Sequence, residues 1–140
     1  MKPEIRICHI WSDVDIVEIK IDVSDGISTF SNRVYVGHEE LTDAISKLHV
    51  FKDHLHGGLL DVRFGEFGCE YAYGAFHARF HFPIPGKLYI TCKQESSFQE
   101  FGKRQVASSA TMYLKSEAIL LDRFIVECGV SFPVQGRKLN

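Results

Sequence analysis

Apolar and polar residues alternate with a period of two over the first quarter of the chain, which predicts β-strands. The clearest case is IVEIKIDVS at residues 16–24, where four β-branched residues share one face and three charged residues share the other. A Ser-Asp-Gly turn follows, and further strands are predicted over residues 5–10 and 28–37. We expect these three strands to form a meander.

The period changes to that of an α-helix in HEELTDAISKLHVF, which starts at His38. Its apolar residues recur three and four positions apart, two glutamates in the first turn suit the helix dipole, and Gly57-Gly58 marks its end. The same spacing predicts a second helix near the C-terminus, with Ser116 as its cap and Gly129 at its end. The apolar stripe of this second helix consists of Leu120, Leu121, Phe124, Ile125 and Cys128.

Strand patterns return between the two predicted helices. LLDVRFGEFGCEYAYG alternates loosely and contains two glycines typical of a bulge or turn, and PIPG separates the strands GAFHARFHF and KLYITCKQ. SSFQEFGKR at 96–104 indicates a loop or a short helical turn, and one more strand is predicted over 104–115. Strands that follow one another without alternating helices predict an α+β fold. We expect a curved, mainly antiparallel sheet of about six to seven strands with two helices packed on it, in the order β-β-β-α-β-β-β-β-α.

The composition indicates one globular domain. Hydrophobic residues make up 45% of the 140 positions, and no linker or repeat divides the chain. Residues 1–140 are therefore expected to form a single domain with a flexible tail over 132–140. No apolar run is long enough for a membrane span and the N-terminus lacks a signal-peptide pattern, which predicts a cytoplasmic protein. The four cysteines are scattered and form no Cys-x-x-Cys pair, so we expect reduced core thiols.

The stretch GAFHARFHFP raises the question of a metal site, because His77 and His81 are four residues apart. Aromatic and polar residues alternate strictly here, which predicts a strand and not a helix. Positions four apart on a strand are separated by roughly 13 Å, whereas two zinc-bound nitrogens lie only about 4 Å apart. His77, Arg79 and His81 are therefore predicted to form a solvated, partner-facing or ligand-facing surface and not a metal site.

His54 and His56, near the exit of the first helix, are the other candidate metal ligands. No cysteine or carboxylate cluster lies near them in the sequence, and imidazoles at a helix C-terminus are explained by the helix dipole. We therefore expect no bound metal and no cofactor.

The sequence contains no motif for nucleotide binding or for an activated nucleophile. Residues 65–68 have two glycines but no following lysine, and Ser108-Ser109 is not part of a nucleophile elbow. Cys69 is the best candidate nucleophile, because it lies beside Glu70 and close to a strand that carries His77. Nothing in the sequence supplies an oxyanion hole, so we expect that the chain is not an enzyme.

The formal net charge is −2, and acidic residues concentrate near the N-terminus. A nucleic-acid partner is not expected, because the chain lacks the basic footprint of such proteins. An acidic face of this kind is commonly only solvated, and a surface for a basic protein partner is the alternative. Trp11 could anchor such an interface, since tryptophan is enriched among interface hot spots, although core packing accounts for Trp11 equally well. The candidate partner-binding residues are Trp11, Asp13, Asp15, Glu18 and Asp22.

Aromatic residues crowd into the segment 64–82. Core packing between a sheet and a helix is one use for them, and lining a ligand pocket is the other. The set consists of Phe64, Phe67, Tyr71, Tyr73, Phe76, Phe80 and Phe82.

Four stretches of the chain resemble a family of small bacterial proteins of unknown function: IVEIKIDVSDGISTFSNRVYVGHEELTDAISKL, the Gly-Gly pair before LDVRFGEF, GAFHARFHF with GKLYITC, and ATMYLKSEAILLDRFIVE. In length and element order, members of that family are similar to immunity proteins encoded beside polymorphic toxins of bacterial competition systems. The resemblance covers residues 14–126, rests on core positions and transfers no functional residue. It implies a cytoplasmic single-domain protein that neutralises a toxin by stoichiometric binding, with its acidic strands facing a basic nuclease.

Two functional hypotheses follow from the sequence. The first is a protein-binding module of the immunity type, which forms a tight complex with a toxin-like partner. The second is a small-ligand-binding or homodimeric accessory domain, which uses an aromatic-lined cavity or the edge of the Phe/His strand. The sequence pattern is compatible with both.

Overall fold

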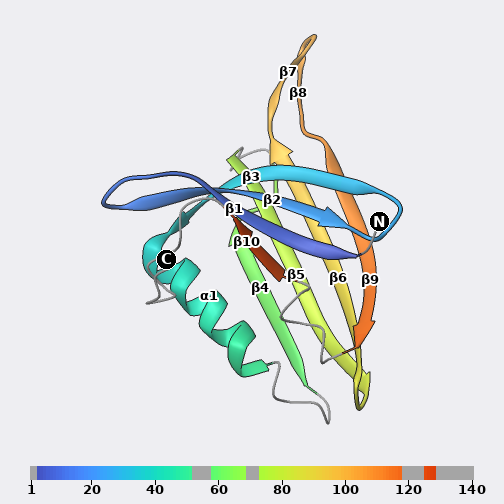
Figure 1. Ribbon diagram of the computed structural model, residues 1–140. Helices are drawn as coiled ribbons and strands as arrows, with labels where there is room; N and C mark the ends of the chain where they lie inside the picture. The colour runs from blue at the N-terminus through green and yellow to red at the C-terminus, as the bar shows by residue number, and fades with distance from the viewer. Residues whose placement is uncertain (1–2, 52–57, 69–72, 118–124, 129–140) are drawn as a thin grey trace.

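The computed structural model describes residues 3–51, 58–68, 73–117 and 125–128 (Figure 1). As the sequence predicts, the fold is α+β with mainly antiparallel pairing. The elements are β1 (Glu4–Ser12), β2 (Ile16–Ser24), β3 (Thr29–Gly37), α1 (His38–Phe51), β4 (Leu59–Gly65), β5 (Tyr73–Ile84), β6 (Lys87–Ser97), β7 (Gln99–Phe101), β8 (Arg104–Val106), β9 (Ser109–Glu117) and β10 (Ile125–Cys128).

The strands form two four-stranded sheets, so the expected single curved sheet is wrong. Sheet A has the order β10-β1-β2-β3 and sheet B the order β4-β5-β6-β9. The two remaining strands, β7 and β8, form a narrow hairpin that projects beyond sheet B (Figure 1). The change from sheet A to sheet B occurs at α1, because this helix separates β3 from β4 and prevents them from pairing as a hairpin. Each sheet then buries one face against the other.

The core lies between the two sheets, whose strands cross at a steep angle (Figure 1). The period-two pattern places the β-branched residues of β2 and the phenylalanines of β5 on the inner faces, where they are buried. Helix α1 connects the sheets and covers one side of the core. Phe51 at the end of α1 stacks on Phe82 with ring centroids 5.1 Å apart and meets Phe80 at a steep angle. The predicted first helix and its apolar stripe are therefore confirmed.

The predicted second helix is wrong wherever the structure describes it. Ser116 belongs to β9 and does not cap a helix, and Ile125–Cys128 form β10, which pairs in parallel with β1. Ile125 and Val126 are β-branched, and the free edge of β1 offers them backbone partners, so tertiary context overrides the helical spacing. The rest of that prediction lies outside the described residues, as does the predicted tail: Leu120, Leu121, Phe124, Gly129 and 132–140.

The segment predicted as a loop or helical turn at 96–104 forms most of the β7–β8 hairpin. Gly102 has a φ of 67°, which suits the tight turn between these strands. At the base of the hairpin, the Ser108 backbone nitrogen donates to the Ser96 hydroxyl at 2.9 Å. Ser108 therefore stabilises a strand connection, and the predicted strand over 104–115 is divided there into β8 and β9.

A buried polar junction joins the two sheets where β3 crosses β5 and β6. Asn32 stands on the inner face of β3 among apolar residues and is 5% exposed. Its Nδ2 donates to the carbonyl oxygens of Ala75 and Glu95, both at 2.9 Å. A buried amide must be paired to be tolerated, so these bonds hold β3 at one position over sheet B.

Gln94 on β6 completes the junction from the other sheet. Its Nε2 donates to Asn32 Oδ1 at 2.9 Å and to the carbonyl oxygens of Ile21 and Phe30 at 3.2 Å. All three neighbours are acceptors, which fixes the orientation of the Gln94 amide. Its Oε1 has no hydrogen-bond partner among the described residues. The side chain is 1% exposed, so each of these bonds is made away from water.

Gly74 allows the close approach of β3 to β5 beside this junction. Its φ is 95°, and a Cβ at this position would lie 2.1 Å from the carbonyl oxygen of Arg33. Gly65 on β4 has a φ of 73° and comes similarly close to the backbone of Gly74. Any side chain here would force the strands apart. Gly65, one of the two glycines that indicated a bulge or turn in the sequence, thus marks a position where backbones nearly touch.

The cysteines differ from the reduced thiols expected. Cys8 is disulfide-bonded, so the expectation is wrong for this residue. In the parallel pairing of β1 with β10, Cys8 and Cys128 occupy partner positions on the backbone. Cys92 is a free, buried thiol, and burial raises its pKa to about 12, as expected of an inert core cysteine. Cys69 lies outside the described residues.

Replacing Gly74 tests the close approach of the sheets. We expect Gly74→Ala to lower the free energy of unfolding by about 3 kcal/mol or more, because left-handed strain of about 1–2 kcal/mol adds to an overlap with the Arg33 carbonyl. Gly86→Ala is the matched control, since Gly86 has a φ of 83° and no atom within 4 Å of its Cβ position. The measurement is urea denaturation of both variants. Equal losses at the two positions would contradict the close approach.

Candidate functional site

An aromatic groove opens on the outer side of sheet A. It has a volume of about 830 Å³ and is lined by residues of β1, β2, β3 and β5. Trp11 is 47% exposed and Tyr73 is 70% exposed, so large apolar surfaces face solvent where burial would be favourable. The core-packing alternative for Trp11 is therefore wrong. The lining residues of this aromatic groove are Ile10, Trp11, Ile16, Glu18, Tyr35 and Tyr73.

A β-bulge places Trp11 in the groove. β1 pairs with β2 in one register as far as His9, and the register shifts by one residue between His9 and Trp11. Continuing the first register would set Trp11 opposite Val17, which is buried in the core. The bulge instead sets Trp11 opposite Glu18, and Glu18 is opposite Tyr35 on β3. Trp11, Glu18 and Tyr35 therefore form a row across three adjacent strands.

Tyr73 extends this row from the other sheet. Its ring meets Tyr35 edge to face, with centroids 6.4 Å apart and an angle of 81° between the planes. Tyr73 immediately precedes Gly74, where the backbones of β3 and β5 come close together. The contact between the sheets thus brings a residue of β5 into a groove built on sheet A.

Glu18 is the carboxylate among the groove-lining residues. Its side chain is 16% exposed, and its Oε2 lies 3.9 Å from a guanidinium nitrogen of Arg33, which is itself largely exposed. An ion pair at this distance and exposure contributes little, about 0–1 kcal/mol. The groove therefore combines aromatic rings with a partly buried negative charge that is only weakly neutralised.

Asp13 and Asp15 lie in the exposed turn between β1 and β2, next to the groove. Asp13 Oδ1 accepts hydrogen bonds from the backbone nitrogens of Ile16 at 2.9 Å and Asp15 at 2.8 Å, which lowers the pKa of Asp13. The ring Nε2 of His38 lies 2.7 Å from the Asp13 carbonyl oxygen. Asp13 therefore shapes the turn, while Asp15 is exposed at its tip. Both carboxyl groups lie within four residues of Trp11 in the sequence.

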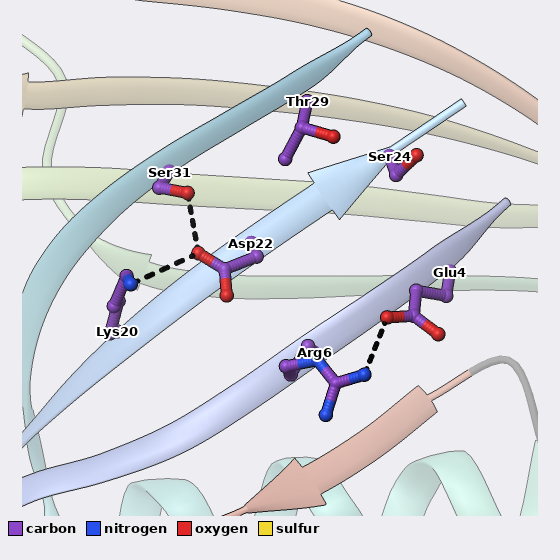
Figure 2. A pocket seen from close by; sticks show the side chains of 7 residues that line it. All are labelled: Glu4, Arg6, Lys20, Asp22, Ser24, Thr29 and Ser31. Atoms are coloured by element: carbon purple, nitrogen blue, oxygen red, sulfur yellow. Dashed lines mark hydrogen bonds and ion pairs between the residues drawn. The ribbon is translucent and has the colours of Figure 1, made fainter. Parts of the chain in front are cut away.

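Asp22 belongs to a different surface feature, a polar hollow of about 490 Å³ further along sheet A (Figure 2). Asp22 Oδ1 accepts a hydrogen bond from the Ser31 hydroxyl and lies 3.8 Å from Lys20 Nζ. On the neighbouring strand Arg6 pairs with Glu4 at 2.9 Å. The charged groups of the hollow are thus paired with one another, and Asp22 does not join Trp11 as the sequence prediction proposed.

His77, Arg79 and His81 lie on the outer face of sheet B, on a strand as predicted. Asp61 on β4 ties two of them together. Its Oδ1 lies 2.8 Å from His77 Nε2 and accepts from Arg79 Nε at 2.9 Å, while its Oδ2 accepts from Arg79 at 3.1 Å. The Arg79 hydrogen bonds and the neighbouring His77 lower the pKa of Asp61 to about 2. His81 is exposed and stands opposite Leu59.

Five further candidate residues lie outside the part of the chain that the structure describes: Cys69, Glu70, His54, His56 and Tyr71. Within the described ranges, no three His, Cys, Asp or Glu side chains are close enough to hold a metal ion. β5 pairs with β4 and β6 along its two edges, so neither edge of the Phe/His strand is open for the homodimer considered as an alternative.

The aromatic-rich segment divides between the core and the surface. Phe64 and Phe76 stack with centroids 5.9 Å apart inside the core, which confirms the core-packing explanation for them. Phe80 and Phe82 are likewise buried, whereas Phe67 and Tyr73 are exposed. The groove residues that sequence reasoning missed are Ile10, Ile16 and Tyr35, whereas Tyr73 was among the aromatics considered for a pocket. Asp61 of the cluster on sheet B was missed as well. Tyr35 could have been found from the sequence, because an aromatic residue on the polar face of a predicted strand indicates a surface site.

Comparison with protein-family models, with curated proteins and with solved structures finds no match to this chain. Among the described residues, no helix has the length and apolar character needed to cross a membrane.

The Asp61 cluster predicts how stability depends on pH. The pKa of Asp61 is about 2 in the folded chain, below its ordinary value of 3.8, so the cluster stabilises the fold above about pH 4 and ceases to do so as the pH falls towards 2. Asp61→Asn should therefore cost about 0.5–1 kcal/mol at pH 6 and less at pH 3. Chemical denaturation at both pH values measures this, with Asp43→Asn on the exposed side of α1 as the control. A loss that is equal at both pH values would contradict the assignment.

Proposed function

We propose that the chain is a non-enzymatic protein-binding module that contacts its partner through the aromatic groove. The observation that carries this proposal is a row across three strands, in which the partly buried Glu18 lies between the exposed rings of Trp11 and Tyr35. Tryptophan and tyrosine are enriched among the residues that dominate binding energy at protein interfaces, and exposed apolar patches mark such surfaces. Because paired strands hold the row, the groove exists before binding and little ordering entropy is lost.

The partner that fits this groove presents a basic side chain. A guanidinium or ammonium group entering it would pair with Glu18 and pack on the ring face of Trp11. The distant contact between Glu18 and Arg33 is weak enough for an incoming cation to replace it. Asp13 and Asp15 at the adjacent turn add negative potential, which accelerates the encounter with a basic surface.

In the specific form of this proposal, the partner is a toxin and the chain acts as its immunity protein. The support is the resemblance of the core pattern to that class together with the acidic rim of the groove. One chain would cover the basic surface of one nuclease molecule. This form of the proposal places the chain in the cytoplasm. The disulfide of Cys8 counts against that location, because disulfides persist mainly in oxidising compartments.

The proposal predicts which substitutions weaken binding. Trp11→Ala should weaken the complex by about 30-fold or more, the loss typical of a hot-spot residue. Glu18→Lys should weaken it further by placing two positive charges in contact. The measurement is calorimetric titration with the product of a toxin-like gene adjacent to this one, combined with a growth-rescue assay of each variant.

Ile27→Ala is the matched control, because Ile27 is 88% exposed and lies outside the groove. It should leave the affinity and the rescue unchanged. Thermal unfolding of each variant separates loss of binding from loss of folding. If Trp11→Ala and Glu18→Lys bind and rescue as well as the unmodified chain, the groove is not the contact surface.

A further inference from the structure

The outer face of sheet B gathers positive charge that the net charge of −2 conceals. Register sets Arg63, His77 and Lys93 side by side on β4, β5 and β6, with Arg79 in the next row. We call this surface the basic face; it is defined by Arg63, Arg79, Tyr89, Lys93, Tyr113 and Lys115, all of which are exposed.

Few negative charges oppose these cations. Cross-strand partners form three rows that run from β4 to β9 through the basic face. Among the described positions of these rows, Asp61 is the one acidic residue, and Arg79 pairs with it through two hydrogen bonds. Glu95 lies in the row beyond, where its carboxylate accepts from the backbone nitrogen of Gly68 at 2.8 Å. Within the part of the chain that the structure describes, Arg63, Lys93 and Lys115 therefore have no acidic partner and can pair with an anionic ligand.

Two tyrosines stand among these cations. Tyr89 is 47% exposed and Tyr113 is 71% exposed. Tyr89 lies opposite Lys115, and Tyr113 is two residues before Lys115 on β9, so the two tyrosines are diagonal neighbours about 7–8 Å apart. Their rings are flat apolar surfaces bordered by positive charge. This combination recurs where an open sheet stacks nucleobases and pairs phosphates with basic side chains.

We propose that the basic face binds single-stranded nucleic acid, independently of the protein partner assigned to the groove. Phosphates would pair with Arg63, Lys93 and Lys115, while bases stack on Tyr113 and Tyr89. The acidic side chains of a peptide would pair with the same cations but offer no aromatic ring to stack on the two tyrosines. The exposed tyrosines therefore favour nucleic acid over an acidic peptide.

The test is fluorescence anisotropy with a labelled oligothymidylate of about 12 nucleotides, a length within the usual range for one binding surface. We expect binding at about 50 mM salt that weakens by about 20-fold at 200 mM, as three neutralised phosphates predict. The double substitution Arg63→Gln with Lys93→Gln should weaken binding by about 10-fold or more and flatten the salt dependence. Tyr113→Leu should weaken it by about 5-fold or more through lost stacking.

Arg33→Gln is the matched control, because Arg33 is an equally exposed cation on sheet A and should change the affinity by less than about 2-fold. A labelled oligoglutamate of equal charge separates base stacking from charge alone. No binding of the oligothymidylate at about 50 mM salt would overturn the proposal. Equal binding of both probes with no effect of Tyr113→Leu would overturn it as well, since the face would then recognise only negative charge.

Discussion

The amide contact between Asn32 and Gln94 constrains how the two sheets of this chain meet. Asn32 reaches from β3 to two carbonyl groups of sheet B, and Gln94 reaches from β6 to two carbonyl groups of sheet A. Two apolar faces can slide over each other at little cost, but buried amides lose their partners when the faces shift by more than a fraction of a bond length. The junction therefore selects one crossing position from the many that hydrophobic burial alone would allow.

Both candidate surfaces depend on that crossing. Where β3 passes over β5, Gly74 removes the side chain that would separate them, and the preceding Tyr73 comes to rest against Tyr35. The aromatic groove thus exists because two sheets touch at this point. The basic face depends on the same arrangement in a different way. Because sheet A covers the inner face of sheet B, Arg79 and the two histidines of β5 are directed to the outer face.

Local patterns predicted the elements better than their assembly. The alternation in β2, the helix from His38 and the strand that carries His77 follow from period and punctuation, and all three are confirmed. The bulge at His9 to Trp11 shifts the register without leaving a glycine signal, so the sequence left surface exposure and core packing of Trp11 equally open. Asn32 and Gln94 resemble surface residues in the sequence, because only the crossing sheets supply their partners. The strand at Ile125 forms because it pairs with the edge of β1, and the local spacing of apolar residues cannot predict this distant pairing.

The most direct test of the account is a double-mutant cycle across the junction. Asn32→Leu and Gln94→Met keep the volume of each side chain and remove its hydrogen bonds, and each should lower the free energy of unfolding by about 1–3 kcal/mol. If the two amides act as one unit, the double variant should lose less than the sum of the single losses, with a coupling of at least about 1 kcal/mol. Additivity within about 0.5 kcal/mol would show that the amides act separately and would contradict the role of the junction.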